Sequence, residues 1–298
     1  MLLKDFWKES VTALGGLYPE GEARSIVTIL CEHLLGVKSY THIIDPGFVI
    51  PQPLVPSLES SMSRLLKAEP VQYVISEAIF CERVFNVNPS VLIPRPETEK
   101  LVSEAVKVSS RLYRSSLGKG SVRVLDLCTG SGCIAWSVAL SVPGVEVVGV
   151  DISEDALEVA EKQDFALEMK DTLAKPPRFI KADILSDEVP LEGEFDLILS
   201  NPPYVMDYQS RSMRPNVLEY EPPIALFVPA HTPLIFYEAI GRLCAKYLKP
   251  GGLGIVEINE LLAPEVESVM QSHGFPHTSV LKDIFNKNRF VSFSKKPF

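Results

Sequence analysis

Asn201, Pro202, Pro203 and Tyr204 form the stretch of this sequence best suited to chemistry, directly after the apolar run 195–200. Two successive prolines remove two backbone donors and fix two φ angles, so a strand must end there in a stiff loop. The loop offers an amide side chain, a proline carbonyl that no nearby N–H is placed to occupy, and an aromatic ring. These groups could hold a flat group that carries an NH2. A rigid turn without chemistry is the competing interpretation.

A second candidate loop lies upstream, where residues 124–135 have the pattern of a strand, a glycine turn and a helix start. Gly130 and Gly132 let the backbone approach a ligand closely. A dinucleotide-binding fold is the obvious competitor for such a glycine pair. Asp126 ends the strand in the pattern Asp-x-x-x-Gly-x-Gly. A carboxylate there would repel a pyrophosphate, but it could receive the cationic methionine end of S-adenosylmethionine, directly or through water.

Two more carboxylates follow the next apolar runs. Asp151 closes residues 147–150, about where a carboxylate accepts ribose hydroxyls in either fold. Asp183 follows residues 180–182 and could reach an adenine amino group. The alternatives are a capping or turn carboxylate for Asp126 and a simple turn aspartate for Asp183. Ligands of open α/β sheets bind at the carboxyl ends of the strands, so these loops and the Asn201 loop predict one site.

A parallel sheet is needed to position these loops. From Ser121 the chain alternates nearly continuous apolar strands with helical stretches, which is typical of a parallel sheet covered on both faces. The predicted strands are 122–127, 145–150, 178–182, 195–200 and 253–258, and the predicted helices lie near 132–141, 153–169 and 233–248. Two last strands, 278–284 and 290–294, are close in sequence and should pair antiparallel at the sheet's edge.

Residues 1–70 are predicted to form a separate helical domain. Apolar side chains recur at helical spacing in residues 20–36, where Gly36 marks the helix end, and a further helix is predicted at 58–68. β-branched and aromatic residues then predict a β-hairpin within residues 71–96, which would link the helical domain to a second domain at 97–298.

Length and composition are those of an ordinary globular chain: 298 residues, 46% hydrophobic and 22% charged. No apolar run reaches the roughly 18 residues that span a bilayer, and the N-terminus lacks the apolar region of a signal peptide, so we expect a cytoplasmic protein without a membrane partner. The net charge of -9 disfavours stable binding of long nucleic acids, since phosphate neutralisation supplies most non-specific binding energy. A local basic patch remains compatible with that charge.

The five cysteines are an odd number without a Cys-x-x-Cys pair, and the five histidines are scattered. This pattern predicts neither a disulfide framework nor a metal site. The cysteines are instead expected to be small buried apolar residues. They are Cys31, Cys81, Cys128, Cys133 and Cys244.

Five segments together carry a family resemblance: 69–73, 92–99, 126–135, 200–205 and 220–226. The chain resembles the class I methyltransferases, and more closely the HemK/PrmC family of peptide chain release factor glutamine N5-methyltransferases. Asn-Pro-Pro-Tyr is shared with adenine-N6 and guanine-N2 methyltransferases, whereas Pro94-Arg95-Pro96 and the Tyr-Glu-Pro-x-x-Ala-Leu run from Tyr220 make the narrower match specific. The resemblance implies a Rossmann-like α/β domain with a mostly parallel seven-stranded sheet and an antiparallel edge hairpin, plus the small helical domain.

The resemblance also assigns residues by position. It implies a cofactor loop at Cys128 to Gly132, a ribose carboxylate at Asp151, an adenine-side contact at Ile184 and a substrate loop at Asn201 to Tyr204. With the residues argued above, the expected cofactor-binding set is Asp126, Cys128, Thr129, Gly130, Ser131, Gly132, Asp151, Asp183, Ile184 and Asn201. The expected catalytic set is Asn201, Pro202, Pro203 and Tyr204.

Three departures from the family pattern bear on substrate positioning and not on the reaction class. Cys128 stands where the general methyltransferase loop has its first glycine, and it should fit only if its φ is negative. Residues 227–234 replace the usual Gly-x-Asp-Gly-Leu, and Asn259 ends a Glu257-Ile258-Asn259 run where Glu-x-Gly is usual.

The resemblance implies methyl transfer from S-adenosylmethionine to the side-chain amide nitrogen of the glutamine in the Gly-Gly-Gln motif of class-1 release factors. In that hypothesis the Asn201 oxygen and the Pro202 carbonyl each accept one substrate N–H, Tyr204 packs on the amide plane, and the helical domain and hairpin hold the rest of the factor. The alternatives are a nucleic-acid amino methyltransferase that flips its target base and a catalytically idle binding module. The first would want a basic channel, and the second is disfavoured by the intact loop residues.

Overall fold

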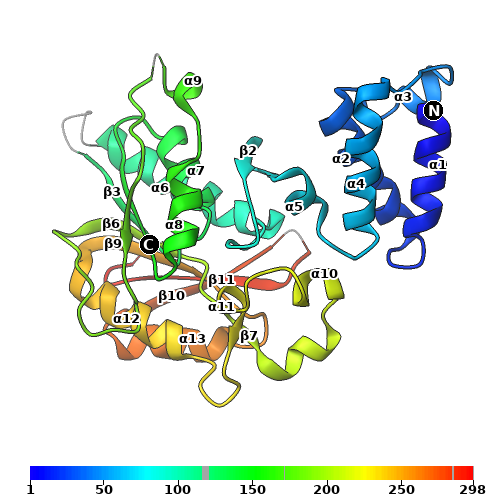
Figure 1. Ribbon diagram of the computed structural model, residues 1–298. Coiled ribbons are helices and arrows are strands. Elements are labelled where there is room, and N and C mark those ends of the chain that lie inside the picture. Colours follow the sequence, from blue (N-terminus) through cyan, green and yellow to red (C-terminus); the bar gives the residue numbers. More distant parts are fainter. Residues whose placement is uncertain (116–120, 171, 284, 298) are drawn as a thin grey trace. The chain divides into compact units, whose positions relative to one another are not determined.

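The computed structural model describes residues 1–115, 121–170, 172–283 and 285–297 (Figure 1). The chain divides into two compact units. The first unit comprises residues 1–77 with 213–220, and the second comprises residues 78–212 with 221–298. No helix in the described ranges is both long and apolar enough to cross a membrane.

The first unit is helical. Its elements are α1 (Leu3–Leu14), α2 (Glu20–Leu35), α3 (Thr41–Ile44), η1 (Gln52–Leu54), α4 (Val55–Leu65), α5 (Val71–Ile75) and α10 (Pro215–Leu218). Leu14, Leu30 and Leu58 are fully buried in its core. The helix predicted at 20–36 is confirmed, and Gly36 ends it with a left-handed φ of +64°. The helix predicted at 58–68 is also present but begins earlier, because Pro56 suits a first helical turn.

Residues 213–220 belong to this unit although they lie far along the sequence. The Arg214 guanidinium donates to the Glu22 carboxylate on α2. The Tyr220 hydroxyl donates to the backbone oxygen of Lys67 at 2.7 Å. These two contacts join a segment of the later chain to the N-terminal helices.

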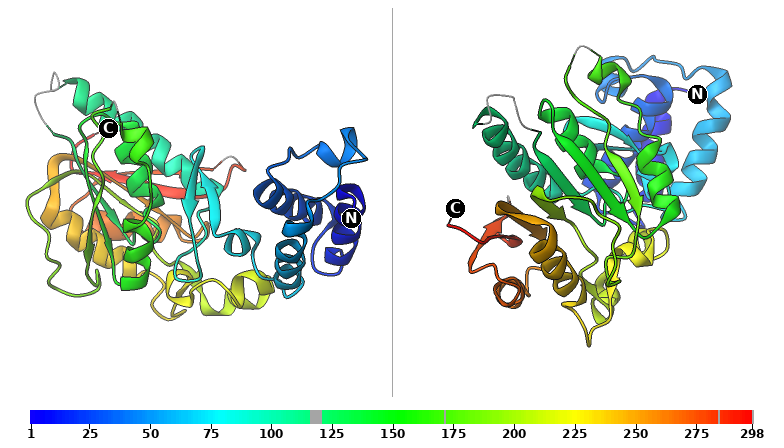
Figure 2. Two further views of the ribbon diagram at one scale, coloured as in Figure 1. Left: turned by 45° about the horizontal axis from the view of Figure 1, so that its top comes forward. Right: turned by 90° about the vertical axis from the view of Figure 1, so that its left-hand side faces the viewer.

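The second unit is built on a seven-stranded sheet in the order β10-β11-β9-β6-β3-β4-β5 (Figures 1 and 2). Strands β5, β4, β3, β6 and β9 pair parallel, whereas β11 pairs antiparallel with both β9 and β10. This confirms the expected sheet and its antiparallel edge. The strands are β3 (Arg123–Leu127), β4 (Glu146–Asp151), β5 (Arg178–Lys181), β6 (Phe195–Ser200), β9 (Leu248–Glu257), β10 (His277–Lys282) and β11 (Asn288–Ser294).

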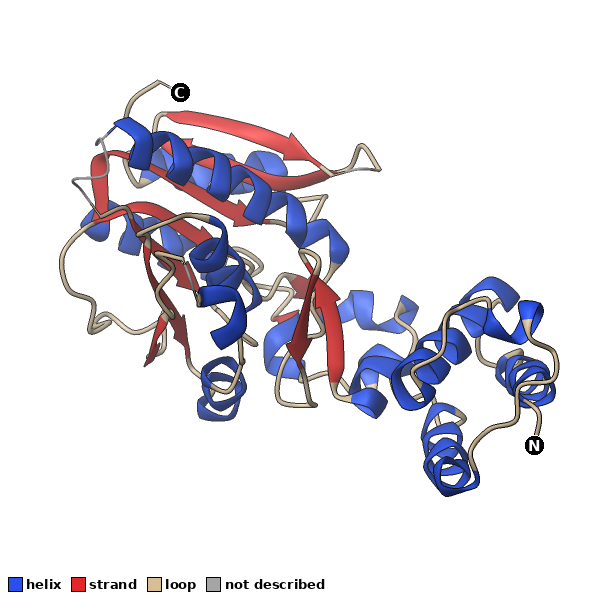
Figure 3. Cartoon of the chain, turned by 90° about the horizontal axis from the view of Figure 1, so that it is seen from above, coloured by secondary structure: helices blue, strands red, loops and turns tan. Residues whose placement is uncertain are grey.

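Helices cover both faces of the sheet (Figures 2 and 3). One core cluster joins Leu125 to residues of α12 (Ile235–Tyr247) and α13 (Ala263–Ser272). The other joins Val124 to residues of α6 (Glu99–Ser115) and α7 (Cys133–Ser141). Successive strand residues thus face opposite cores, which explains the nearly continuous apolar runs. The helical stretch expected at 153–169 is two helices, α8 (Glu154–Glu161) and α9 (Ala166–Met169), and α13 was not predicted.

A β-hairpin does lie within residues 71–96, but its turn is at Cys81 and Glu82 and not at Asn88-Pro89-Ser90, and residues 91–93 form no strand. Strands β1 (Glu77–Phe80) and β2 (Arg83–Asn86) form a two-stranded sheet. The turn residues Cys81 and Glu82 have φ of +49° and +61°, the backbone that a type I′ hairpin turn requires. Phe80 and Phe85 are fully buried and anchor the hairpin in the core beside α7.

The order of the strands reverses between β3 and β6, since β4 lies on one side of β3 and β6 on the other. Ligands bind at such switch points in open α/β sheets. Leu127 and Ser200 are partners in the ladder, and the Ser200 hydroxyl donates to the Leu127 backbone oxygen at 2.8 Å. The loops that begin at Cys128 and Asn201 therefore start side by side.

Gly254 provides a test of the packing between β9 and β11. A Cβ at Gly254 would lie 2.2 Å from the fully buried Phe293 ring, whereas a Cβ at Gly251 on the same strand would meet nothing within 4 Å. Gly254→Ala should lower the free energy of unfolding by about 1–3 kcal/mol, the usual cost of overpacking. Gly251→Ala, the control, should change it by less than about 0.5 kcal/mol. Urea unfolding measures both, and equal losses would contradict this packing argument.

Candidate active site

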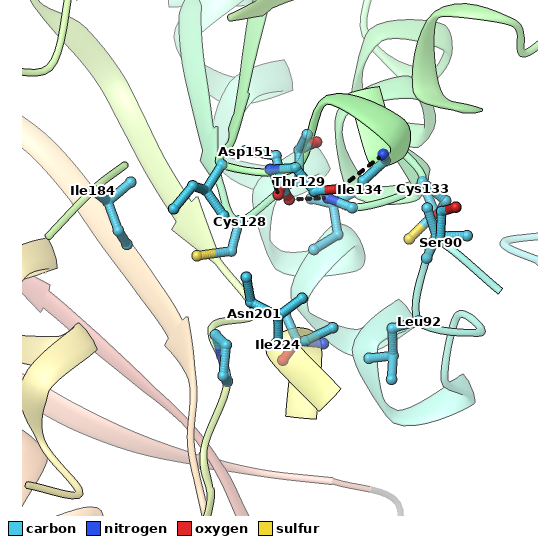
Figure 4. Close-up of a pocket in the computed structure, with 18 of the residues that line it drawn as sticks. Ser90, Leu92, Cys128, Thr129, Cys133, Ile134, Asp151, Ile184, Asn201 and Ile224 are labelled. Carbon is cyan, nitrogen blue, oxygen red and sulfur yellow. Dashed lines mark hydrogen bonds between the residues drawn. The ribbon is translucent and has the colours of Figure 1, made fainter. Parts of the chain in front are cut away.

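A cavity in the second unit opens at the carboxyl ends of β3, β4, β5 and β6 (Figure 4). Its wall also includes part of the segment before α6, residues Ser90 to Thr98, and Ile224 and Ala225 of α11 (Pro223–Leu226). In the view of Figure 4, Ile184 lies on one side of the cavity and Leu92 on the opposite side.

Most of the residues expected from the sequence meet in this wall. They are Cys128, Thr129, Gly130, Ser131, Asp151, Asp183, Ile184, Asn201 and Pro203. Four expected residues do not line the cavity: Asp126, Gly132, Pro202 and Tyr204. The Asp126 side chain accepts a hydrogen bond from Thr129, which lines the cavity. The Tyr204 hydroxyl donates to Glu257, which also accepts from Thr98 of the cavity wall.

The loop after β3 turns sharply. Thr129 N–H donates to the Val150 oxygen at 3.0 Å, and Gly132 N–H donates to the Thr129 oxygen at 2.9 Å. Gly132 has a φ of +75°, and a Cβ there would lie 3.0 Å from the Ala160 Cβ. The expectation that Cys128 has a negative φ is wrong, because its φ is +59°. The turn imposes the left-handed conformation at this position, which costs a non-glycine residue on the order of 1–3 kcal/mol.

Asp126 lies beneath the loop, fully buried. Its Oδ2 accepts a hydrogen bond of 2.6 Å from the Thr129 hydroxyl, while its Oδ1 has no partner among the described residues. Burial raises the pKa of Asp126 to about 7, against the lowering effect of the Thr129 hydrogen bond. A buried carboxylate with an open oxygen and no basic partner suits a ligand that carries positive charge near Thr129.

Asp151 is bound to the backbone through both carboxylate oxygens. Oδ2 accepts from Gly130 N–H at 2.8 Å and Oδ1 from Ser153 N–H at 3.0 Å. Burial raises its pKa in spite of these bonds. Each carboxylate oxygen can accept a second hydrogen bond. Asp151 is therefore equipped to receive hydroxyl groups of a ligand in the cavity.

The loop after β5 supplies an apolar side of the cavity, with Ile184 buried and Leu185 partly exposed. Asp183 Oδ1 accepts from Leu185 N–H at 2.9 Å, which is the simple turn given as the alternative for this residue. Arg242 of α12 donates to the Ile184 oxygen at 3.1 Å and to the Ser186 oxygen at 2.8 Å. The guanidinium thereby fixes the backbone of this wall.

Asn201 is joined to a buried carboxylate through a hydroxyl. Its Nδ2 lies 3.4 Å from Thr98 Oγ1, and that hydroxyl donates to Glu257 Oε2 at 2.7 Å. The Tyr204 hydroxyl donates to the other oxygen, Oε1, at 3.0 Å. Burial raises the pKa of Glu257 to about 7, although these two hydrogen bonds lower the pKa. Tyr204 packs on the core, so the structure places its ring behind the loop and not in the cavity wall.

Thr98 and Glu257 were not among the residues expected at the site. Glu257 stands at the end of an apolar strand, the same signal that identified Asp126 and Asp151. Thr98 is the last residue of η2 (Pro96–Thr98). It lies far from Asn201 in the sequence, so no local sequence pattern predicts their contact.

A second missed pair links two segments of the cavity wall. Arg95 Nη2 donates to Glu221 Oε1 at 2.5 Å, and Ile93 N–H donates to Glu221 Oε2 at 3.1 Å. The Glu221 side chain is almost completely buried. These bonds fix the Pro-Arg-Pro segment against the segment that leads into α11. Both segments carry the family resemblance, but the sequence did not predict either as part of the site.

The described cysteines are free thiols. Cys31 and Cys244 are buried as expected, whereas Cys81, Cys128 and Cys133 are only partly buried, so the expectation is wrong for these three. Burial raises the pKa of Cys31 to about 12, so its thiol stays protonated near neutral pH. In the part of the chain that the structure describes, no cluster of three or more His, Cys, Asp or Glu residues is placed to hold a metal ion.

Comparison with known proteins shows the family of the chain. The family model described as "Methyltransferase small domain" matches residues 102–218. A release factor glutamine methyltransferase of Flavobacterium psychrophilum is 35% identical, over 98% of this chain and 98% of its own length. One of Bacteroides thetaiotaomicron is 36% identical, over 95% of this chain and 96% of its own.

Among solved structures, a release-factor-specific protein-(glutamine-N5) methyltransferase from Alicyclobacillus acidocaldarius is 28% identical. The match covers 72% of this chain and 100% of that one, with a TM-score of 0.40. The two relatives of full length exceed 30% identity across nearly the whole chain. The protein therefore belongs to the family of release factor glutamine methyltransferases.

Proposed function

We propose that this protein transfers a methyl group from S-adenosylmethionine to the side-chain amide nitrogen of the glutamine in the Gly-Gly-Gln motif of class-1 peptide chain release factors, in the cytoplasm. The observation that carries the proposal is that the Asn201 loop and the glycine loop line the same cavity. Full-length similarity to release factor glutamine methyltransferases supports the choice of substrate.

The cavity residues fit the cofactor chemically. Asp151 would accept the ribose hydroxyls, and Ile184 and Leu185 would pack against the adenine. The buried, partly unpaired Asp126 would favour the cationic methionine end through Thr129. When bound, the cofactor supplies an activated methyl group on a sulfonium. The remaining chemistry is the orientation of the substrate by this chain.

An amide nitrogen is a poor nucleophile because its lone pair is delocalised into the carbonyl. In the proposed mechanism the Asn201 oxygen and the Pro202 carbonyl each accept one N–H of the substrate amide, which directs the lone pair toward the methyl group. No hydrogen bond to the Pro202 oxygen is found within the described residues, so no protein donor competes with the substrate for it, although Pro202 is buried and is not among the residues that line the cavity. Each such bond is worth only about 1 kcal/mol net. Alignment of the reacting atoms supplies more, on the order of 7–11 kcal/mol.

No side chain is assigned as a general base, since the methyl group is activated before attack. The substrate nitrogen gains the methyl group and releases one N–H proton to water, and the sulfonium becomes a neutral thioether. Pro203 keeps the loop rigid. Tyr204 holds the end of the loop through its hydrogen bond to Glu257.

The proposed function is tested with labelled S-adenosylmethionine and three separate acceptors: a release factor, the same factor with its Gly-Gly-Gln glutamine changed to alanine, and nucleic acid. We expect label only on the intact factor. Label on nucleic acid would favour the alternative of a nucleic-acid amino methyltransferase. Equal label on both forms of the factor would show that the methyl group is transferred to a residue other than the Gly-Gly-Gln glutamine.

Asn201→Ala should lower kcat on the release factor by about 100-fold or more, because the amide aligns the nucleophile. The affinity for S-adenosylmethionine should fall by less than about tenfold, the effect of one lost hydrogen bond. Single-turnover kinetics and calorimetry measure the two quantities. Equal losses in both would show that Asn201 is chiefly a cofactor ligand.

Asp151→Ala should weaken cofactor binding by about 1–3 kcal/mol, the range for charge-assisted bonds and for buried groups left unpaired. Asp155→Ala is the control, since Asp155 is exposed on α8 and does not line the cavity. Calorimetry with S-adenosylmethionine compares the two variants. Unchanged affinity in Asp151→Ala would move the ribose contact to another residue.

The helical unit is proposed to recognise the folded release factor. Exposed apolar residues gather in its segment 40–49, where Ile43 is 69% and Ile44 70% exposed. Changing both to serine should raise KM for the intact factor by about tenfold, the effect of losing roughly 1.4 kcal/mol of contact. It should leave activity on a short Gly-Gly-Gln peptide unchanged. The control is Leu167→Ser in the second unit, where Leu167 is 90% exposed. An unchanged KM in the double variant would remove this segment from the recognition surface.

A further inference from the structure

Glu257 ends β9, the strand that pairs with β6 on the side away from β3. The ladder pairs Val256 with Ser200, so Glu257 and Asn201 are the next residues along two parallel strands. Glu257 is 1% exposed. Its carboxylate is thus buried directly beside the loop that is proposed to hold the substrate amide.

The hydrogen bonds between these residues have a fixed direction. An ionised carboxylate only accepts, and a threonine hydroxyl has one proton to donate. Thr98 gives that proton to Glu257 Oε2 at 2.7 Å, so toward Asn201 its oxygen can only accept. The group of Asn201 that faces Thr98 at 3.4 Å must then be the NH2.

We propose that Glu257 and Thr98 are positioning residues that set the direction of the Asn201 amide, so that its oxygen and not its NH2 is presented to the substrate amide. The inference rests on the proposed function, in which that oxygen accepts a substrate N–H. A reversed Asn201 amide would present a donor to a donor, and the substrate nitrogen would lose one of its two acceptors.

The same carboxylate also fixes the far end of the loop. Glu257 Oε1 accepts from the Tyr204 hydroxyl at 3.0 Å. Asn259 Nδ2 donates to the Tyr204 backbone oxygen at 3.2 Å and to Gln209 Oε1 at 3.0 Å. Asn259 is the residue that departs from the family pattern, and here it bonds the loop through its side chain. One strand end therefore holds both the first and the last residue of Asn-Pro-Pro-Tyr.

The direction of these bonds depends on the charge of Glu257. Burial raises its pKa to about 7, nearby Glu97 raises it further, and Arg289 of β11 opposes both. Arg289 is itself paired with Asp283 at 3.1 Å. A protonated Glu257 can donate, which frees the Thr98 proton for the Asn201 oxygen and allows the amide to reverse. Activity should therefore fall as the pH drops below about 7.

The experiment compares kcat and KM on the release factor, and the Kd for S-adenosylmethionine, in four variants of the full chain. Thr98→Val has nearly the shape of threonine without the hydroxyl, and Glu257→Gln keeps the shape but adds a donor. Both should lower kcat about tenfold or more, the effect of one to two kilocalories of lost alignment. KM and Kd should stay within about twofold, since Glu257 does not line the cavity and the Thr98 hydroxyl is already bonded to Glu257 and Asn201.

Two further variants separate this role from a structural one. Thr98→Ser keeps the hydroxyl and should recover most of the kcat lost in Thr98→Val. Tyr237→Phe is the packing control, because the Tyr237 hydroxyl donates to the backbone oxygen of Glu257, at 3.2 Å, whereas the carboxylate oxygens accept from Thr98 and Tyr204. Its kcat should remain near the wild-type value.

A pH profile adds an independent readout. Asp126 has a similarly raised pKa, so the profiles must be compared between variants. The acid-side fall of kcat near pH 7 should be weaker in Glu257→Gln than in the wild type. An identical acid limb in the two enzymes would overturn the role of Glu257.

The outcomes separate the two proposals. If the wild type does not methylate the factor, the proposed function fails and this inference fails with it. If the wild type is active but Thr98→Val keeps its kcat, or Thr98→Ser is as slow as Thr98→Val, only the positioning role is wrong.

Discussion

The parallel pairing of β3 with β6 is the contact on which the site depends. The last pair of this ladder is Leu127 with Ser200, and the Ser200 hydroxyl donates a hydrogen bond to the Leu127 backbone oxygen. Beyond this point two prolines stop one strand and a glycine turn stops the other. Because neither loop can continue the ladder, their polar groups are left to face a ligand. A shift of register by one residue would turn each of these side chains to the opposite face.

Carboxylates lie at or next to the ends of three strands of the same sheet, at Asp126, Asp151 and Glu257. Burial raises the pKa of each, because backbone and hydroxyl donors only partly replace water. A carboxyl with a raised pKa in the folded state binds its proton more tightly there than in the unfolded chain. Its contribution to stability is present at low pH and is lost as the pH rises toward about 7 for Asp126 and Glu257. Ionisation of these buried carboxylates thus lowers the free energy of unfolding at neutral pH. A cationic ligand or fixed hydrogen bonds can offset that loss.

Patterns of apolar residues predicted the strands, their antiparallel edge and most of the loops, because each of those features is local. Contacts between distant segments left no such pattern, so Thr98 and Glu257 could not be joined to Asn201, and residues 213–220 could not be joined to the helical unit. The sequence predicts the wrong sign for the φ of Cys128, because the size of a side chain does not reveal the turn that is closed by the hydrogen bond from Thr129 N–H to the Val150 oxygen. Sequence spacing therefore predicted where the strands end, but not which distant residues contact the side chains of the loops that follow.

Charge in the cavity wall bears on the choice between a protein amide and a nucleic-acid base. Both substrates present an NH2, so the acceptors of the Asn201 loop cannot tell them apart. The charged residues of the wall are Arg95, Asp151 and Asp183, and Arg95 is neutralised by the buried Glu221. The two remaining carboxylates would repel phosphates within a Debye length of about 8–10 Å. A neutral Gly-Gly-Gln loop meets no such repulsion, and a cationic cofactor is attracted. The net negative charge of the wall thus supports the protein substrate proposed above, which the geometry of the loop alone does not distinguish from a base.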